Sequence, residues 1–249
     1  MTRREFLRLM VLSGFALATP ASILKASGSK EGALQGAHKK WAMAVSVFGC
    51  ANKEECAACI DACRRVHNLP DIPDRRREIK WIWTTPFEAL FPEELSYMRE
   101  LKGREVLTLC NHCENPPCVS VCPTKATFKR DDGIVMMDYH RCIGCRYCMA
   151  ACPYGARSFN WFDPRPFIHA IDKGYPTRTK GVVEKCNFCE ERLATGLIPA
   201  CVEACQEKCL TFGDLSDESS SVRRLLATRP ALQRKAELGT RPKVFYLLA

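Results

Sequence analysis

Alternation of apolar and polar residues predicts a few short strands between polar, cysteine-bearing stretches. Residues 41–48 (WAMAVSVF), 79–83 (IKWIW) and 105–109 (EVLTL) are rich in β-branched and aromatic side chains, which favours a strand in each. The run at 127–138 (TFKRDDGIVMMD) predicts a β-hairpin, because Asp-Gly is a tight-turn pair between two apolar arms. The last apolar run, PKVFYLL at 242–248, is strand-like and can return to the sheet.

Apolar residues at helical spacing are confined to short stretches, so we expect only short helices. They are predicted over 59–67, within 86–102, and over 119–122, 148–152 and 219–229. Pro123 and Pro153 follow two of these stretches and should end them. Serines at the start of the last stretch are candidates for its N-cap. After residue 27 no apolar run reaches about 18 residues, so no membrane-spanning helix is expected there.

Sixteen of the 17 cysteines fall into four groups of four, and each group ends in a Cys-x3-Cys step. The third group, CIGCRYCMAACP, is the C-x2-C-x2-C-x3-C-P run of bacterial ferredoxins, in which a short loop wraps an iron–sulfur cube. Gly144 lets this loop turn close to the cube. The four groups can therefore bind four [4Fe–4S] clusters. The groups are Cys50, Cys56, Cys59 and Cys63; Cys110, Cys113, Cys118 and Cys122; Cys142, Cys145, Cys148 and Cys152; and Cys186, Cys189, Cys201 and Cys205.

Two other uses of these cysteines compete with iron and sulfur. Zinc sites usually combine two Cys-x2-Cys pairs, which explains Cys186 with Cys189 but not the third cysteine and the Cys-Pro of the third group. A disulfide framework fits an exported protein, yet a tight C-x2-C-x2-C run does not easily place disulfide partners across a fold. An iron–sulfur protein is the favoured interpretation, and a zinc-stabilised scaffold is the rival of another class.

The formal net charge of +9 does not indicate a nucleic-acid partner. Four bound clusters replace sixteen thiols by thiolates and add four cores of charge +2, which leaves a net charge of about +1. No arginine-rich run is interleaved with aromatic residues. No nucleophile–base pair, phosphate-binding loop or metal–water site is evident. We therefore expect neither nucleic acid nor a small-molecule substrate to bind.

Residues 1–26 predict an export signal. Arg3 and Arg4 are followed by Phe6 and Leu7 and by a modest apolar stretch, which is typical of a twin-arginine leader. A short N-terminal helix is the alternative. Clusters are assembled in the reducing cytoplasm, so a protein with several clusters must cross the membrane already folded. We expect the chain at the periplasmic face of the cytoplasmic membrane, held there by partner subunits, with cleavage or retention of the leader left open.

In two-cluster ferredoxins the fourth cysteine of each run ligates the other cluster of the pair. By analogy, groups two and three form an inner unit, groups one and four form an outer unit, and each fourth cysteine joins the companion group. The expected quartets are Cys110, Cys113 and Cys118 with Cys152; Cys142, Cys145 and Cys148 with Cys122; Cys50, Cys56 and Cys59 with Cys205; and Cys186, Cys189 and Cys201 with Cys63.

These cysteine-bearing segments resemble a known family. Residues 110–159, and KCNFCEERLATGLIPACVEAC at 185–205, are similar to the four-cluster iron–sulfur subunit of the molybdopterin oxidoreductase (DMSO reductase, polysulfide reductase) superfamily. The resemblance covers nearly all of residues 41–249. It implies an α+β fold of nested bacterial ferredoxin-like units, pseudo-two-fold and loop-rich, built around [4Fe–4S] clusters. Because the cysteines inflate the ordinary hydrophobic content of 47%, we also expect the clusters to act as part of the core of a chain that lacks a large apolar interior. The expected domains are a leader (1–26), the first half of the outer unit with an insertion (27–104), the inner two-cluster unit (105–160), the second half of the outer unit (161–212) and a C-terminal tail (213–249).

Within this family, CAACIDACRRVHN, IKWIW and the leader most resemble the DsrO type, the periplasmic subunit of the DsrMKJOP membrane complex of sulfur-metabolising prokaryotes. The resemblance implies a non-catalytic electron-transfer subunit that links the quinone pool to sulfur metabolism (sulfite or sulfate). The implied partners are an NrfD-like polytopic membrane subunit, a multihaem cytochrome c and other subunits of the complex. The alternative is the iron–sulfur subunit of a molybdopterin reductase for polysulfide, tetrathionate or a similar acceptor.

The first cysteine group departs from the family pattern. Lys53 stands where a cysteine is usual, and Cys50 is the natural substitute, with three extra residues in the loop. If Cys50 does not reach the iron, the first cluster would be absent or a [3Fe–4S] form. Arg64 and Gln206 replace the proline that often follows the fourth cysteine. Cys209 is left over; we expect a buried, small apolar residue, with ligand exchange as the alternative.

His112, inside CNHC, is expected to hydrogen-bond near a sulfide or to a backbone carbonyl rather than to bind iron. Three other histidines favour surface or structural roles: His67, His140 and His169. Four aromatic residues between the first two groups form either local core or a docking patch for a membrane partner: Trp81, Trp83, Phe87 and Phe91. The charged, proline-bearing stretch 64–80, with Arg75–Arg77, predicts a solvated surface excursion.

Overall fold

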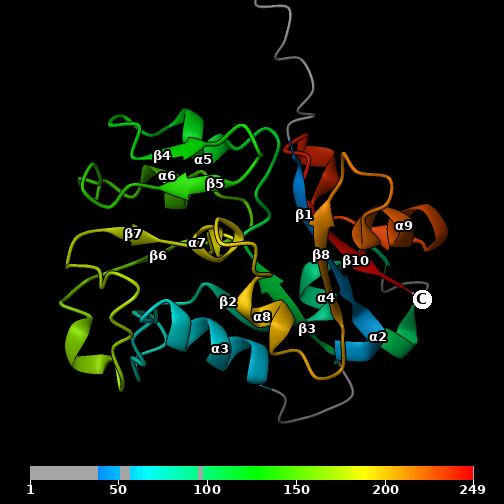
Figure 1. Ribbon diagram of the computed structural model, residues 1–249, viewed down its shortest axis with the longest axis horizontal. Coiled ribbons are helices and arrows are strands. Elements are labelled where there is room, and N and C mark those ends of the chain that lie inside the picture. The colour runs from blue at the N-terminus through cyan, green and yellow to red at the C-terminus, as the bar shows by residue number, and fades with distance from the viewer. Residues whose placement is uncertain (1–38, 51–56, 95–97, 249) are drawn as a thin grey trace, which may run out of the picture. The chain divides into compact units, whose positions relative to one another are not determined.

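A four-stranded sheet brings the two ends of the described chain together (Figure 1). Its central strand β1 (Trp41–Ser46) pairs antiparallel with β8 (Leu210–Asp214) and parallel with β10 (Val244–Leu247). A short strand, β9 (Ala231–Leu232), pairs antiparallel with β10. The predicted return of the last apolar run to the sheet is therefore confirmed, and it places the C-terminal strand directly beside the first one.

The computed structural model describes residues 39–50, 57–94 and 98–248, and these residues form one compact unit. The predicted leader, Lys53 and Cys56 lie outside the described residues. Within the described ranges, no helix is long and apolar enough to cross a membrane.

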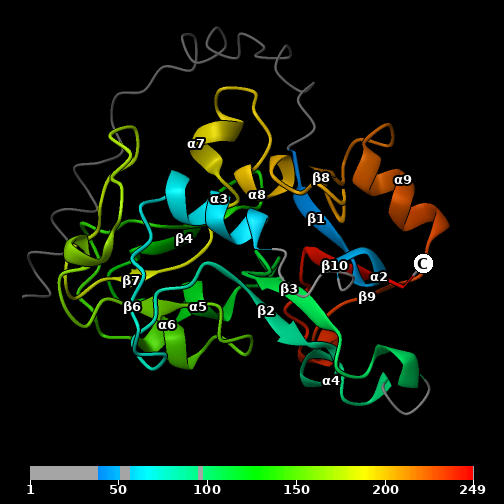
Figure 2. The ribbon, with the colours of Figure 1, turned by 90° about the horizontal axis from the view of Figure 1, so that it is seen from below.

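The described chain also contains three two-stranded antiparallel sheets (Figure 2). They pair β2 (Ile82–Pro86) with β3 (Glu105–Leu109), β4 (Thr127–Lys129) with β5 (Val135–Met137), and β6 (Ser158–Phe159) with β7 (Val183–Glu184). The predicted hairpin is confirmed, and Gly133 takes the positive φ of +80° that its turn requires. The strand expected at 79–83 begins only at Ile82, and Ile79 and Trp81 just before it are buried in the core.

The helices are short, as predicted. They are α2 (Val47–Cys50), α3 (Ala58–Val66), α4 (Phe87–Leu90), α5 (Pro117–Ser120), α6 (Tyr147–Ala150), α7 (Glu190–Leu193), α8 (Ala200–Glu203) and α9 (Ser221–Thr228), with 3-10 turns η2 (Arg99–Leu101), η3 (Arg165–Phe167) and η4 (Ala236–Leu238). The prediction that a serine side chain caps the N-terminus of α9 is wrong. Ser220 stands at the N-cap position without capping the helix, because its hydroxyl accepts a hydrogen bond from the Asp214 backbone N–H and ties α9 to the end of β8.

The expectation that the chain lacks a large apolar interior is wrong. One continuous group of buried apolar residues includes Met43 of β1, Phe188 of the fourth cysteine group and Tyr246 of β10. Three of the four aromatic residues between groups one and two are buried in it, which confirms the local-core interpretation for them: Trp81, Phe87 and Phe91. The docking-patch alternative is wrong for these three. The predicted clusters therefore add to an ordinary core instead of replacing one.

Candidate metal centres

The described cysteines lie in loops and on short helices. The structure describes fifteen of the sixteen expected ligands, all but Cys56. Cys59 and Cys63 lie on α3, and Cys201 lies on α8, which packs against α3 (Figure 2). Most of these thiols are buried or half-buried, whereas Cys145 is exposed.

Three of the cysteine loops share one backbone conformation. The residue directly before the second cysteine has a positive φ in groups two, three and four, at His112 (41°), Gly144 (70°) and Phe188 (58°). Such values are uncommon for residues other than glycine, so their recurrence at one loop position indicates the same tight turn. At Gly144 a Cβ atom would also collide with the carbonyl oxygen of Gly181. The sequence indicated only Gly144, because nothing in the types of His112 and Phe188 predicts this conformation.

The third cysteine group forms a pocket together with the last cysteine of the second group. Four cysteines line this pocket: Cys122, Cys142, Cys145 and Cys148. Burial raises the pKa of Cys148, and Cys118, Cys142 and Cys122 raise it further, against the lowering effect of Arg157. At Cys122 burial also raises the pKa, but hydrogen bonds from the backbone of Thr127 and neighbouring donors outweigh it and lower the pKa. Such donors stabilise a thiolate.

The second cysteine group lies with the last cysteine of the third group. Cys110 and Cys152 pack against a buried cluster that contains Cys113 and Tyr154. Burial raises the pKa of Cys113 to about 12, with Cys110, Cys118 and Cys152 adding to the rise and a hydrogen bond with Thr240 opposing it. The thiols expected to share one cluster therefore lie close enough to raise one another's pKa. A bound, positively charged iron–sulfur core would instead favour their thiolate forms.

The fourth cysteine group lies with Cys63 of the first group. Burial raises the pKa of Cys63 well above its usual value, and Cys186, Cys201 and Cys189 raise it further. Backbone N–H groups point at sulfur here as well: Phe188 donates to Cys186 Sγ and Ala200 to Cys189 Sγ, both at 3.4 Å. Hydrogen bonds to ligand sulfur are one of the means by which proteins set cluster potentials.

The second and fourth cysteine groups meet at His112 and Phe188. Their rings stack with centroids 3.7 Å apart. Burial is the main cause that raises the pKa of Cys186, and Cys110 is the thiol that raises it most. His112 Nδ1 accepts a hydrogen bond from the Val135 backbone N–H at 3.0 Å, so Nε2 is the ring nitrogen that remains for the expected donation. Burial lowers the pKa of His112 well below its usual value, and nearby cations such as Lys185 lower it further.

The donor set fits iron–sulfur clusters. The lining of the third-group pocket contains four thiols and no carboxylate or histidine, and thiolates are the ligands that iron–sulfur clusters select. A buried cation, Arg157, lies beside Cys118, Cys148 and Cys110 without a carboxylate partner among the described residues. Loaded clusters are anionic, so they would supply the counter-charge that a buried guanidinium needs.

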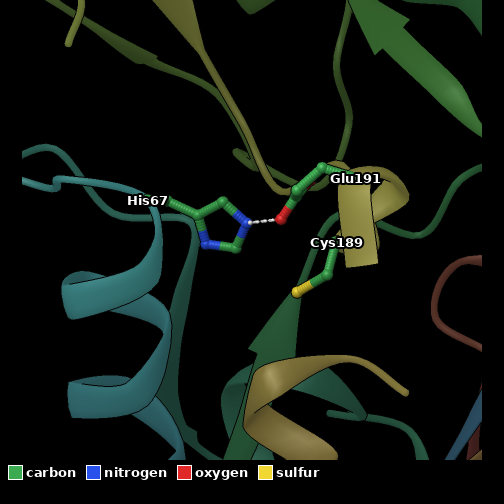
Figure 3. A group of neighbouring side chains, drawn as sticks. All are labelled: His67, Cys189 and Glu191. Atoms are coloured by element: carbon green, nitrogen blue, oxygen red, sulfur yellow. Dashed lines mark hydrogen bonds and ion pairs between the residues drawn. The ribbon is translucent and has the colours of Figure 1, made fainter. Parts of the chain in front are cut away.

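His67 lies beside the outer thiols in a group with Cys189 and Glu191 (Figure 3). Its Nε2 is 2.9 Å from a Glu191 carboxylate oxygen, and its Nδ1 is 3.6 Å from Cys63 Sγ. Burial raises the pKa of Glu191, but the hydrogen bond with His67 and the charge of that ring lower it overall. The expected structural role fits His67, which is fully buried against the Trp81 ring. His140 and His169 are exposed.

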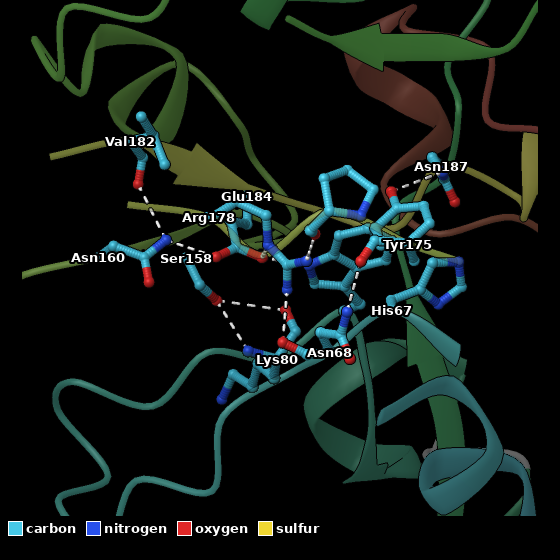
Figure 4. A network of polar contacts seen from close by, with 12 residues as sticks. His67, Asn68, Lys80, Ser158, Asn160, Tyr175, Arg178, Val182, Glu184 and Asn187 are labelled. Atoms are coloured by element: carbon cyan, nitrogen blue, oxygen red, sulfur yellow. Dashed lines mark hydrogen bonds and ion pairs between the residues drawn. The ribbon is translucent and has the colours of Figure 1, made fainter. Parts of the chain in front are cut away.

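A buried polar network fixes the excursion next to this site (Figure 4). Arg178 Nε pairs with Glu184 at 2.7 Å, with both side chains almost fully buried. Trp81 donates to the same carboxylate at 3.1 Å, and Arg178 donates to the backbone oxygen of Asn68 at 2.9 Å. The first part of the excursion is therefore anchored in the interior, whereas Arg75–Arg77 are exposed, as predicted.

Cys209 is buried, in agreement with the expected small apolar role. Its backbone N–H donates to Cys205 Sγ at 3.3 Å. Burial raises the pKa of Cys209 to about 12, and Cys205 and Cys50 raise it further. The cysteine left over by the motifs therefore lies beside two of the expected ligands of the first cluster.

Comparison with known proteins agrees with this geometry. The 4Fe-4S dicluster domain family matches residues 106–164 and 171–215. The chain is 41% identical to the Hdr-like menaquinol oxidoreductase iron-sulfur subunit 1 of Archaeoglobus fulgidus, over 99% of this chain and 97% of that protein. It is 40% identical to the B subunit of polysulfide reductase from Wolinella succinogenes (76% and 86% covered) and 36% identical to the menaquinone reductase iron-sulfur cluster-binding subunit of Nitratidesulfovibrio vulgaris (84% and 88% covered).

These matches favour iron–sulfur clusters over zinc, the two metal sites that the cysteine spacing left open. The protein binds several [4Fe–4S] clusters through its cysteines, which sets aside the zinc scaffold, and its mixed α+β, loop-rich fold is that of a ferredoxin-like dicluster protein. The electron-transfer role inferred from the sequence is confirmed by relatives that are iron–sulfur subunits of oxidoreductases. The protein belongs to the family of 4Fe–4S dicluster iron–sulfur subunits of DMSO reductase-like, polysulfide reductase-like and Hdr-like menaquinol oxidoreductase complexes.

Proposed function

We propose that this chain relays electrons through four [4Fe–4S] clusters in a membrane-bound respiratory complex that links the quinone pool to sulfite or sulfate metabolism. The observation that carries the proposal is the gathering of thiols around the second, third and fourth cysteine groups, each with a cysteine of a companion group beside it. A set of linked clusters matches a relay better than a single catalytic centre.

The proposed ligands are the four crossed quartets, in two nested ferredoxin-like units with the boundaries expected from the sequence. The pocket lined by Cys122 and the third group supports one crossed quartet, and the surroundings of Cys113 and Cys63 support two others. The quartet of Cys50, Cys59 and Cys205 also requires Cys56, which lies outside the described residues. The short contact between the units at His112 and Phe188 offers a route for electrons from one unit to the other.

The proposed complex is of the DsrO type, with an NrfD-like polytopic membrane subunit and a multihaem cytochrome c as partners. Relatives named as menaquinol oxidoreductase and menaquinone reductase subunits support exchange with a quinone. The twin-arginine pattern of residues 1–26 supports a position at the extracytoplasmic face of the membrane. The chain would then reach the membrane through its partners.

One exposed apolar surface supports a partner at the third cysteine group. Ile143 and Tyr147, which flank the exposed Cys145, are 67% and 65% exposed, and Trp161 nearby is 43% exposed. Arg146 lies over the Trp161 ring at 4.8 Å and links the two parts of this surface. Large apolar side chains around an accessible cluster ligand are the arrangement expected where a partner subunit covers the cluster.

The test is quinol-driven reduction of the clusters in the complex purified from membranes. A menaquinol analogue should bleach the visible absorbance of the clusters and produce their reduced EPR signals, and a quinone-site inhibitor of the complex should prevent both. If quinol leaves the clusters oxidised while a reduced substrate of a copurifying molybdopterin subunit reduces them, the proposed link to the quinone pool is wrong.

That second result would favour the alternative, the iron–sulfur subunit of a molybdopterin reductase for polysulfide, tetrathionate or a similar acceptor. The observation in its favour is the match to the B subunit of polysulfide reductase, which spans 86% of that protein.

A further inference from the structure

Arg157 is a buried cation between the two inner cysteine groups. The residue is 6% exposed. Its Nη2 donates to Thr127 Oγ1 at 2.8 Å, and its Nη1 lies 3.7 Å from Met137 Sδ. Thr127 and Met137 stand opposite each other on β4 and β5, the hairpin that joins the second cysteine group to the third. The hairpin therefore holds the guanidinium in one place.

The thiols around Arg157 come from both inner quartets. Cys118, Cys148 and Cys110 are, in that order, the strongest electrostatic partners of the guanidinium. Cys118 on α5 and Cys148 on α6 are also packed together in one buried apolar cluster, although they belong to different proposed quartets. A single positive charge therefore faces ligands of two clusters.

The charge of Arg157 has no acidic partner within the ion-pair distance among the described residues. Arg178 shows the contrast, because that buried guanidinium is paired with Glu184 at 2.7 Å. A buried charge without a partner is costly. A [4Fe–4S] core of charge +2 held by four thiolates has a net charge of about −2, so the two inner clusters would balance the guanidinium when bound.

We propose that Arg157 is a tuning residue that raises the reduction potentials of both inner clusters, an inference that rests on the proposed electron relay. When bound, each cluster would take up one electron released by oxidation of the quinol and gain one negative charge, while Arg157 keeps its proton. A fixed cation beside the ligands favours the more negative, reduced form, and the effect is strong where water is excluded. The inner clusters therefore hold electrons more readily than they would without Arg157.

The experiment is an EPR-monitored redox titration of the complete, cluster-loaded chain. Arg157→Met removes the charge and keeps the length of the side chain, and it should lower the midpoint potentials of two of the four clusters while the other two stay at their wild-type values. Arg157→Lys keeps the charge and should restore most of the shift. The matched control is Arg165→Met, because Arg165 is exposed and paired with Asp163, and it should change none of the four potentials.

Thr127→Val provides a second route if Arg157→Met loses its clusters. It removes the hydrogen bond that fixes the guanidinium but keeps the charge, and it should shift the same two clusters by a smaller amount. Unchanged potentials in these variants, or a shift of one cluster only, would overturn the shared role of Arg157. A wild-type chain without four reducible clusters would instead overturn the proposed relay, so the two failures are distinguishable.

Discussion

At the scale of single residues, the backbone before the second cysteine of each loop decides whether the loop can surround a cluster. Groups two, three and four all place this residue at positive φ, but only the third uses glycine there. His112 and Phe188 accept a conformation that costs about 1–2 kcal/mol for an L-residue, and their stacked rings help to hold it. At Gly144 the space is also closed by the carbonyl oxygen of Gly181.

Gly144→Ala should therefore lose the cluster of the third group, while Gly155→Ala should keep it. Both glycines have similar positive φ values, 70° and 62°, so both variants carry the same backbone penalty. Only Gly144 has an atom in the way of a Cβ, since nothing lies within 4 Å of the position at Gly155. Iron per chain is the measurement. An equal loss in both variants would show that backbone strain, and not the collision, matters.

At the scale of elements, the arrangement of short helices places Cys122, Cys152 and Cys63 near cysteines of a companion group. Helices α5 and α6 pack together, as do α3 and α8. Strand β3, the hairpin and the C-terminal strand could be predicted from the sequence, because alternation and the Asp-Gly turn are local signals. The burial of Trp81 and the use of Ser220 by β8 could not, because both depend on segments far away in the sequence.

Pairs of cysteine variants test the crossed ligation. If Cys122 and Cys145 bind one cluster, either serine variant should lose about four irons, and the double variant should lose no more than about four. Uncrossed ligation predicts a loss of about eight irons from the double variant. The pair Cys113 and Cys122 gives the opposite pattern, because crossed ligation places these two cysteines on different clusters. Iron and acid-labile sulfide per chain are the measurements.

The buried pair of Arg178 and Glu184 should contribute strongly to the anchoring of the excursion. Arg178→Met leaves a carboxylate buried without its ion partner, which typically costs about 3–5 kcal/mol. Arg165→Met removes an exposed pair and should change the free energy of unfolding little. The denaturant concentration at which cluster absorbance disappears should fall clearly for Arg178→Met only. Similar midpoints for both variants would show that the network does not anchor this part of the fold.

At the scale of the whole molecule, both the proposed clusters and the apolar core stabilise the fold. The large apolar core connects β1, the excursion and the fourth cysteine group, so part of the fold should persist without metal. The charges complement the clusters, because the formal charge of +9 falls to about +1 when four clusters are bound. Ile143 and Tyr147 of the third group are exposed, so they belong neither to the apolar core nor to the proposed cluster ligands.

Ile143→Glu and Tyr147→Glu should reduce copurification with the other subunits and leave the iron content unchanged. A charge on this surface opposes burial against a partner, whereas neither side chain is a proposed ligand. Leu238→Glu is the matched control, because Leu238 is 52% exposed on η4, outside the cysteine groups. Normal assembly of the first two variants would show that this surface does not contact a partner.

The central claim is tested most directly by the iron and acid-labile sulfide content of the anaerobically purified chain, together with EPR of the reduced and oxidised forms. Four cubane clusters predict about sixteen irons and sixteen sulfides per chain, interacting signals after reduction, and no [3Fe–4S] signal after oxidation. About twelve irons, or a persistent [3Fe–4S] signal, would contradict a complete set of four cubanes.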